Sequence, residues 1–96
     1  MATTLSENLY NQISIRIIKE QELIIGPVAW EEAKKVPGLT VNEGKVSMQG
    51  DVREVLNKLV SQYAKLFGQA STEACKEAVQ DLLVELPKDQ VPQSLQ

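Results

Sequence analysis

Residues 5–36 decide the fold and read LSENLYNQISIRIIKEQELIIGPVAWEEAKKV, with a Gly26-Pro27 step between two helical patterns. Before that step, apolar residues recur every four positions, which predicts an amphipathic α-helix that ends near Ile25. This first stripe comprises Leu5, Leu9, Ile13 and Ile17 and is widened by Tyr10 and Ile24. On another side of the same helix, a second stripe comprises Ile15, Ile18 and Ile25. The helix therefore needs two surfaces to pack against.

The second surface comes either from the rest of the chain or from another molecule. In the first case the helix is the centre of a bundle whose other helices cover both of its sides. In the second case it forms a homodimer, which we favour because only three other short elements are available to cover it. The predicted contact surface is Ile15, Ile18, Ile25 and Trp30, with Trp30 as an aromatic anchor.

A short second helix is predicted from Pro27 to Lys35, since proline is well suited to the first helical position. The residues expected to face inward are Val28, Ala29, Ala33 and Val36. The adjacent Glu31 and Glu32 point in different directions on such a helix, and we expect them on a solvated face rather than in acid–base work.

Residues 39–48 alternate between apolar and polar side chains, with Asn42-Glu43-Gly44 between the two halves. This pattern predicts a small β-hairpin with a three-residue turn, and an irregular loop is the alternative. A two-stranded ribbon is only marginally stable alone, so we expect it to lie against the helices.

The pattern of residues 51–86 predicts two amphipathic helices. Asp51 followed by Glu54 is a cap-like start for one that ends at Gly68, and Ser71 or Thr72 caps the next, which Pro87 ends. The short connection favours an antiparallel pair. The two apolar faces are Val52, Val55, Leu56, Leu59, Val60, Tyr63, Leu66 and Phe67, then Cys75, Ala78, Val79, Leu82, Leu83 and Leu86.

The expected fold is mainly α, a compact bundle of about four helices with a possible small β-hairpin at 39–48. Residues 5–86 form the single helical domain, residues 1–4 a frayed N-terminus, and residues 87–96, with two prolines and few apolar groups, a flexible tail.

Composition excludes several functional classes for this chain of 96 residues. Its net charge is −3, and no basic face offsets it, so we expect no nucleic-acid partner. No apolar run is long enough to span a membrane, and the first residues, MATTLSEN, lack the basic residues and apolar core of a signal peptide. With a single cysteine, Cys75, an internal disulfide is impossible, which suits a reducing compartment. We therefore expect a cytoplasmic protein without membrane partners.

Catalytic, cofactor and metal sites are not expected either. The chain has no histidine, the commonest general base and transition-metal ligand. Cys75 lies on an apolar stripe with no base to activate it, so we interpret it as a buried structural thiol. The sequence predicts a non-catalytic protein-interaction or regulatory module. The alternative is a small-molecule-binding domain, with a pocket between hairpin and helices lined by Met48, Tyr63 and Phe67.

The string Glu22-Leu23-Ile24-Ile25-Gly26-Pro27-Val28-Ala29 resembles an "IGPxA" element. Such elements occur in small helical domains at the ends of bacterial signalling proteins, and the wider pattern is similar to uncharacterised stand-alone proteins of cyanobacterial type. The resemblance covers roughly residues 16–79. It implies a regulatory or interaction role in signalling rather than a reaction.

Overall fold

The computed structural model describes residues 4–42 and 45–95, with residues 4–8 described by their backbone alone. It confirms a mainly α fold with a small antiparallel hairpin. In chain order the elements are α1 (Thr4–Ile25), α2 (Val28–Ala33), β1 (Leu39–Asn42), β2 (Lys45–Met48), α3 (Val52–Phe67), α4 (Gln69–Leu83) and the short 3₁₀ helices η1 (Lys88–Gln90) and η2 (Gln93–Leu95).

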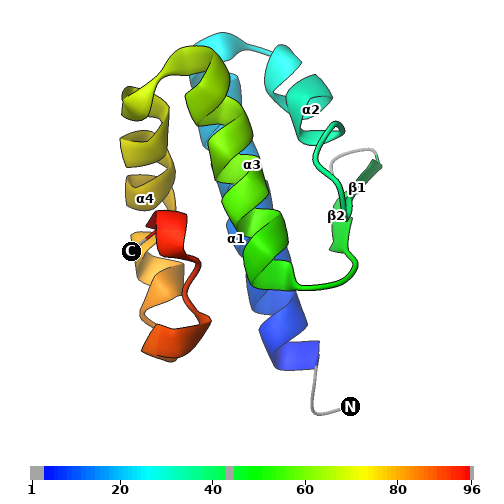
Figure 1. Cartoon of the computed structure of the whole chain (residues 1–96), viewed down its shortest axis with the longest axis vertical. Coiled ribbons are helices and arrows are strands. Elements are labelled where there is room, and N and C mark those ends of the chain that lie inside the picture. The colour runs from blue at the N-terminus through cyan, green and yellow to red at the C-terminus, as the bar shows by residue number, and fades with distance from the viewer. Residues whose placement is uncertain (1–3, 43–44, 96) are drawn as a thin grey trace.

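Helix α1 is the centre of the fold. It contacts α2, α3, α4 and β2, so its own chain surrounds most of its length. Helices α1 and α3 run in the same direction, and α4 returns antiparallel to both (Figure 1). Only Gly68 separates α3 from α4, and such a short connection favours an antiparallel arrangement of the two helices. Among the described residues, no helix combines the length and the apolar character needed to cross a membrane.

The ends of α3 follow the predicted signals. Asp51 is the N-cap, and its carboxylate accepts hydrogen bonds from the backbone N–H groups of Arg53 at 3.1 Å and Glu54 at 3.4 Å. Gly68 ends the helix with φ at +87°, a conformation that glycine adopts without steric cost. Helix α4 begins at Gln69, two residues before the predicted cap at Ser71, whose side chain is buried instead.

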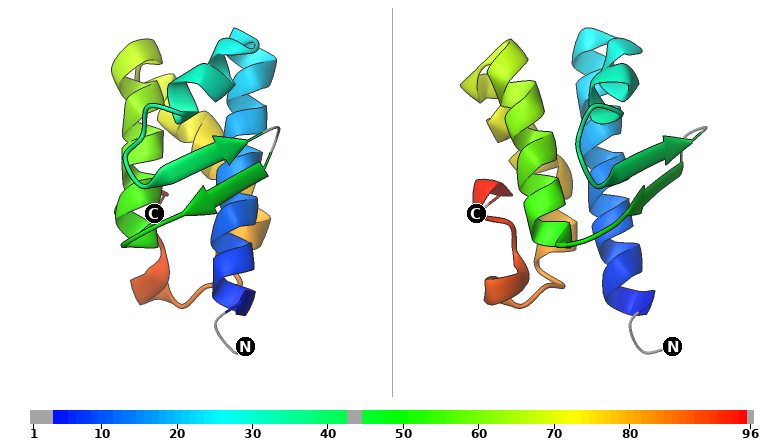
Figure 2. Two further views of the ribbon diagram at one scale, coloured as in Figure 1. Left: turned by 90° about the vertical axis from the view of Figure 1, so that its right-hand side faces the viewer. Right: turned by 45° about the vertical axis from the view of Figure 1, so that its right-hand side comes forward.

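The hairpin at 39–48 is present, and its register pairs Leu39 with Met48 and Asn42 with Lys45. Asn42 therefore belongs to a strand rather than to the predicted turn, and the rest of that turn, Glu43-Gly44, lies outside the described residues. The hairpin lies beside α1, which it contacts through β2 (Figure 2). Leu39 and Val46 are buried, so the ribbon is stabilised by packing on the helices as expected.

Helix α2 is shorter than predicted, and two of the expectations for it are wrong. Val28 is 41% exposed, and Glu32 is buried rather than solvated. The Glu32 carboxylate accepts hydrogen bonds from Gln62 Nε2 at 2.8 Å and Lys35 Nζ at 3.0 Å, which compensates its burial. Both bonds lower the pKa of Glu32, the one from Gln62 most. The carboxylate thereby ties α2 to α3.

The C-terminal residues are not a flexible tail, contrary to expectation. Residues 87–95 turn back after α4 and lie along α3 and α4 (Figure 1), where Pro92 and Leu95 are buried. Two helical side chains bind the backbone of this segment: Tyr10 Oη on α1 donates to the carbonyl of Gln90, and Asn57 Oδ1 on α3 accepts from the N–H of Ser94. At the other end, α1 already begins at Thr4, and residues 1–3 of the predicted frayed terminus lie outside the described residues.

Candidate interaction surface

The four residues of the predicted dimer contact differ in how far they are buried. Ile18 is 0% exposed and belongs to the core, together with Ile13 and Ile17 of the first stripe. Placing Ile18 on a contact surface was therefore wrong, because the chain's own elements enclose both sides of α1 at this height. The middle of α1 therefore follows the alternative interpretation, in which the other elements of the chain cover both sides of the helix.

Ile15, Ile25 and Trp30 are partly buried and pack against the core from its edge. Their role in an interface stays a prediction. Ile15 also borders a hollow of about 300 Å³ along the outer side of α1. The residues that line this hollow are Gln12, Ile15, Arg16, Lys19, Glu20 and Leu23.

A second group of apolar residues is far more exposed. We call it the apolar end; it comprises Leu23 (83% exposed), Ile24 (60%), Val28 (41%), Leu66 (48%) and Phe67 (42%). These residues come from the last turns of α1 and α3 and from the start of α2. The C-terminal ends of α1 and α3 lie at the same end of the molecule in every view (Figures 1 and 2). Most surface apolar side chains are scattered singly, whereas these five come from three elements at one end of the molecule.

Periodicity alone missed the apolar end for a physical reason. The spacing of apolar residues gives the angle of a side chain around the helix, but not whether a neighbour stands beside it at that height. Ile24 has the angle of the first stripe, and Leu66 and Phe67 have the angle of the buried face of α3. All three lie in a last helical turn, next to Gly26 or Gly68, where the neighbouring elements no longer cover them. Their position close to a glycine that ends a helix was the sequence signal that could have predicted their exposure.

Charges of both signs accompany the apolar end. Glu22 precedes Leu23 on α1, and Lys65 precedes Leu66 on α3. Further down α1, Arg16 is already engaged, since its guanidinium contacts Asp81 of α4 at 2.7 Å and thereby lowers the pKa of that carboxyl. This ion pair links α1 to α4 on the surface.

The alternative small-molecule pocket is not formed as predicted. Tyr63 is 0% exposed, and its hydroxyl donates a hydrogen bond of 2.6 Å to the carbonyl of Ala29. Burial raises the pKa of Tyr63 well above its usual range. Phe67 is exposed in the last turn of α3, whereas Met48 borders a hollow of about 300 Å³ near the start of that helix. The length of α3 separates the two side chains, so these residues do not line one cavity.

Cys75 is a buried thiol, as expected. It is 0% exposed, and burial raises its pKa to about 11, so it is protonated at neutral pH. The Gln21 amide lies next to it, with Nε2 at 3.4 Å from Sγ and at 3.3 Å from the carbonyl oxygen of Ser71. Gln21 Oε1 is buried without a hydrogen-bond partner among the described residues. This polar group joins α1 to α4 inside the core.

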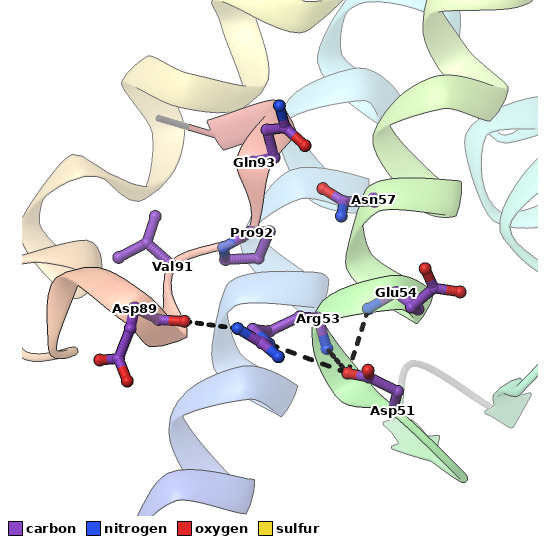
Figure 3. Close-up of a pocket in the computed structure, with 8 residues that line it drawn as sticks. All are labelled: Asp51, Arg53, Glu54, Asn57, Asp89, Val91, Pro92 and Gln93. Atoms are coloured by element: carbon purple, nitrogen blue, oxygen red, sulfur yellow. Dashed lines mark hydrogen bonds and ion pairs between the residues drawn. The ribbon is translucent and has the colours of Figure 1, made fainter.

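A polar hollow of about 340 Å³ lies between the start of α3 and the C-terminal segment. Arg53 projects across it from α3 towards the carbonyl of Asp89 on one side and towards Asp51 on the other (Figure 3). The described residues bring together no group of three or more His, Cys, Asp or Glu side chains able to hold a metal ion.

Comparisons with known proteins add no relative: no family model matches the chain, and no curated protein or solved structure matches it. The resemblance to "IGPxA" domains of signalling proteins therefore stays a prediction based on its short string.

Proposed function

We propose that the protein is a non-catalytic interaction module that pairs with a second copy of itself through the apolar end. The observation that carries this proposal is the exposure of five large apolar side chains at one end of a chain whose core is otherwise enclosed. Burying a fully exposed side chain of this size contributes about 1.5–3 kcal/mol, and the half-buried members of the apolar end contribute less. Together they offset part of the cost of association. A regulatory role in signalling fits the same surface.

A second copy suits this surface because the surface carries complementary charges. In a two-fold interface, a residue on one copy meets a different residue on the other, and the reverse contact is made at the same time. Glu22 precedes Leu23 on α1, and Lys65 precedes Leu66 on α3. A two-fold pairing allows the carboxylate of Glu22 to face the ammonium group of Lys65 across the interface, on both sides of a central apolar contact.

The decisive experiment is a mass measurement on the full chain by sedimentation equilibrium over a range of concentrations. Leu23→Glu places a charge at the most exposed residue of the proposed contact. We expect its dimer dissociation constant to rise at least tenfold, which corresponds to about 1.4 kcal/mol. Val84→Glu is a matched control, because Val84 is 82% exposed against 83% for Leu23 and lies outside the apolar end.

The control is expected to associate as the parent chain does. If the parent and Leu23→Glu show the same concentration dependence of mass, the apolar end is not a self-association surface. If the two glutamate variants are weakened equally, added charge rather than position is responsible, and the proposal also fails.

A further inference from the structure

A small hollow of about 210 Å³ lies between α3 and the residues that follow α2. Val36 and Pro37 supply its apolar part, and α3 supplies the polar side chains Lys58, Ser61, Gln62 and Lys65. Pockets for drug-sized ligands measure about 300–1,000 Å³, so this hollow suits a single small group rather than a large cofactor.

The polar side chains of the hollow share one face of α3. Positions 58, 61, 62 and 65 are related by steps of three and four residues, which places their side chains above one another on a helix. Lys58 and Lys65 are about two helical turns apart, with Ser61 between them. Because the charge of a lysine stands at the end of a long flexible stem, both ammonium groups can reach an ion beside the Ser61 hydroxyl.

Lys58 and Lys65 are exposed, and neither forms an ion pair within the part of the chain that the structure describes. Glu54 precedes Lys58 by about one turn but is not paired with it. The Ser61 hydroxyl is exposed as well and makes no side-chain hydrogen bond to another described residue. Two cations and one hydroxyl donor are therefore available to a ligand.

The carboxylates of α2 that lie near the hollow are already neutralised. Glu32 accepts hydrogen bonds from Lys35 Nζ at 3.0 Å and from Gln62 Nε2 at 2.8 Å, and Glu31 is paired with Lys34 at 3.3 Å. These pairs leave the positive charge of the two unpaired lysines uncompensated. The hollow is thus a local exception to the net charge of −3 that the whole chain carries.

We propose that this hollow binds the phosphate group of a phosphomonoester. Lysine binds phosphate as a point charge, and a serine hydroxyl donates one further hydrogen bond to a phosphate oxygen. A phosphomonoester carries a charge of about −1.5 to −2 at pH 7, which two ammonium groups match, whereas a carboxylate or a phosphodiester carries a single charge. The carbon that bears the phosphate would contact Val36 and Pro37. This site lies within one molecule and does not depend on the proposed function.

A titration of the full chain with methyl phosphate, followed by amide NMR spectra, tests the site. Saturable shifts are expected for the amides of residues 36, 38 and 58–65. Dimethyl phosphate has the same shape but a single negative charge, and we expect it to bind about fivefold more weakly. Equal affinities for the two esters, a preference for the diester, or the absence of a saturable shift at these amides overturns the proposal.

Three substitutions separate the hollow from the overall charge of the chain. Lys58→Gln is expected to weaken the binding of methyl phosphate about fivefold, as for the loss of one strong exposed ion pair. Lys58→Arg keeps the charge and is expected to retain the affinity. Lys45→Gln is the matched control, because it removes the same charge from an exposed residue of β2 outside the hollow. Equal weakening by the two glutamine variants contradicts the proposal.

A phosphoserine tripeptide, Gly-phosphoserine-Gly, distinguishes the two sources of the phosphate group. Both probes carry the same dianion, so binding of either at residues 58–65 supports the site. Affinities within about twofold of each other indicate a small phosphorylated molecule, whereas tighter binding of the peptide indicates a phosphorylated protein.

The same methyl phosphate titration in a Leu23→Glu background separates this inference from self-association, since Lys65 also precedes Leu66 of the apolar end. The affinity is expected to be unchanged there, whether or not the parent chain associates. Loss of binding in that background overturns the proposal, because the site would then require the pairing of two copies.

Discussion

The middle of α1 and its last turn carry the same kinds of side chain in opposite environments. Ile13, Ile17 and Ile18 are 0% exposed, whereas Leu23 and Ile24, one or two turns later, are 83% and 60% exposed. The helix is continuous through both, so the difference arises from the neighbours. Helices α3 and α4, together with the hairpin, cover the middle of α1. After the turn at Gly26-Pro27, α2 packs against α1 but leaves Leu23 and Ile24 exposed.

In this domain, the exposed apolar residues of the central helix lie at its C-terminal end. The sequence shows more apolar residues on α1 than a helix with one buried face needs. The most exposed of these residues, Leu23 and Ile24, lie in the last turns of the helix, whereas Ile25 beside them packs against the core. A bundle of short elements can bury the middle of a central helix and still leave one side of its end in water.

The largest expected effect contrasts the two regions by the same truncation. Ile18→Ala removes buried side-chain volume and is expected to lower the free energy of unfolding by about 2–5 kcal/mol. Ile24→Ala removes a side chain that is largely in water and is expected to change it by less than about 0.5 kcal/mol. Urea unfolding at low protein concentration, where association does not contribute, measures both. Equal losses in the two variants would show that the end of α1 is enclosed after all.

A smaller effect concerns the position of α2, which carries Val28 into the apolar end. Folding lowers the pKa of Glu32 from its ordinary value of 4.5, so the folded state favours the ionised carboxylate. Its contribution to stability is therefore present above pH 4.5 and is lost as the pH falls through the lower, folded pKa. Glu32→Gln is expected to be less stable than the parent at pH 7.

The stability difference between parent and Glu32→Gln is expected to shrink as the pH is lowered below 4.5, because the parent carboxylate then becomes protonated. Thermal unfolding of both proteins over a pH series measures the difference. A gap that stays constant on acidification contradicts the assigned role of the Gln62 and Lys35 hydrogen bonds.

The sequence predicts those parts of the fold that local signals determine. Asp51 and Gly68 mark the ends of α3 because a cap and a left-handed stop act within a few residues. The alternation in 39–48 likewise predicts the hairpin, and the short connection at Gly68 predicts the antiparallel helix pair. Cys75 is recognisable as a buried thiol because its helical stripe is apolar on both sides along the chain.

The parts that were missed depend on contacts between distant residues. The segment PKDQVPQSLQ has the composition of a tail, yet Tyr10 and Asn57, 80 and 37 residues away from their partners, hold its backbone. Its prolines also reduce the entropy that is lost on ordering. In the same way, Glu32 on its short helix gives no sign of burial until Gln62 is placed beside it. The spacing of residues along the sequence cannot predict contacts between residues so far apart.

The most direct test of the apolar end as a contact surface is a concentration series of amide NMR spectra of the full chain. The account predicts that signals of residues 22–28 and 65–68 shift as the protein concentration rises, while those of residues 13–18 stay fixed. Spectra without a concentration dependence, or with shifts outside the apolar end, would contradict it.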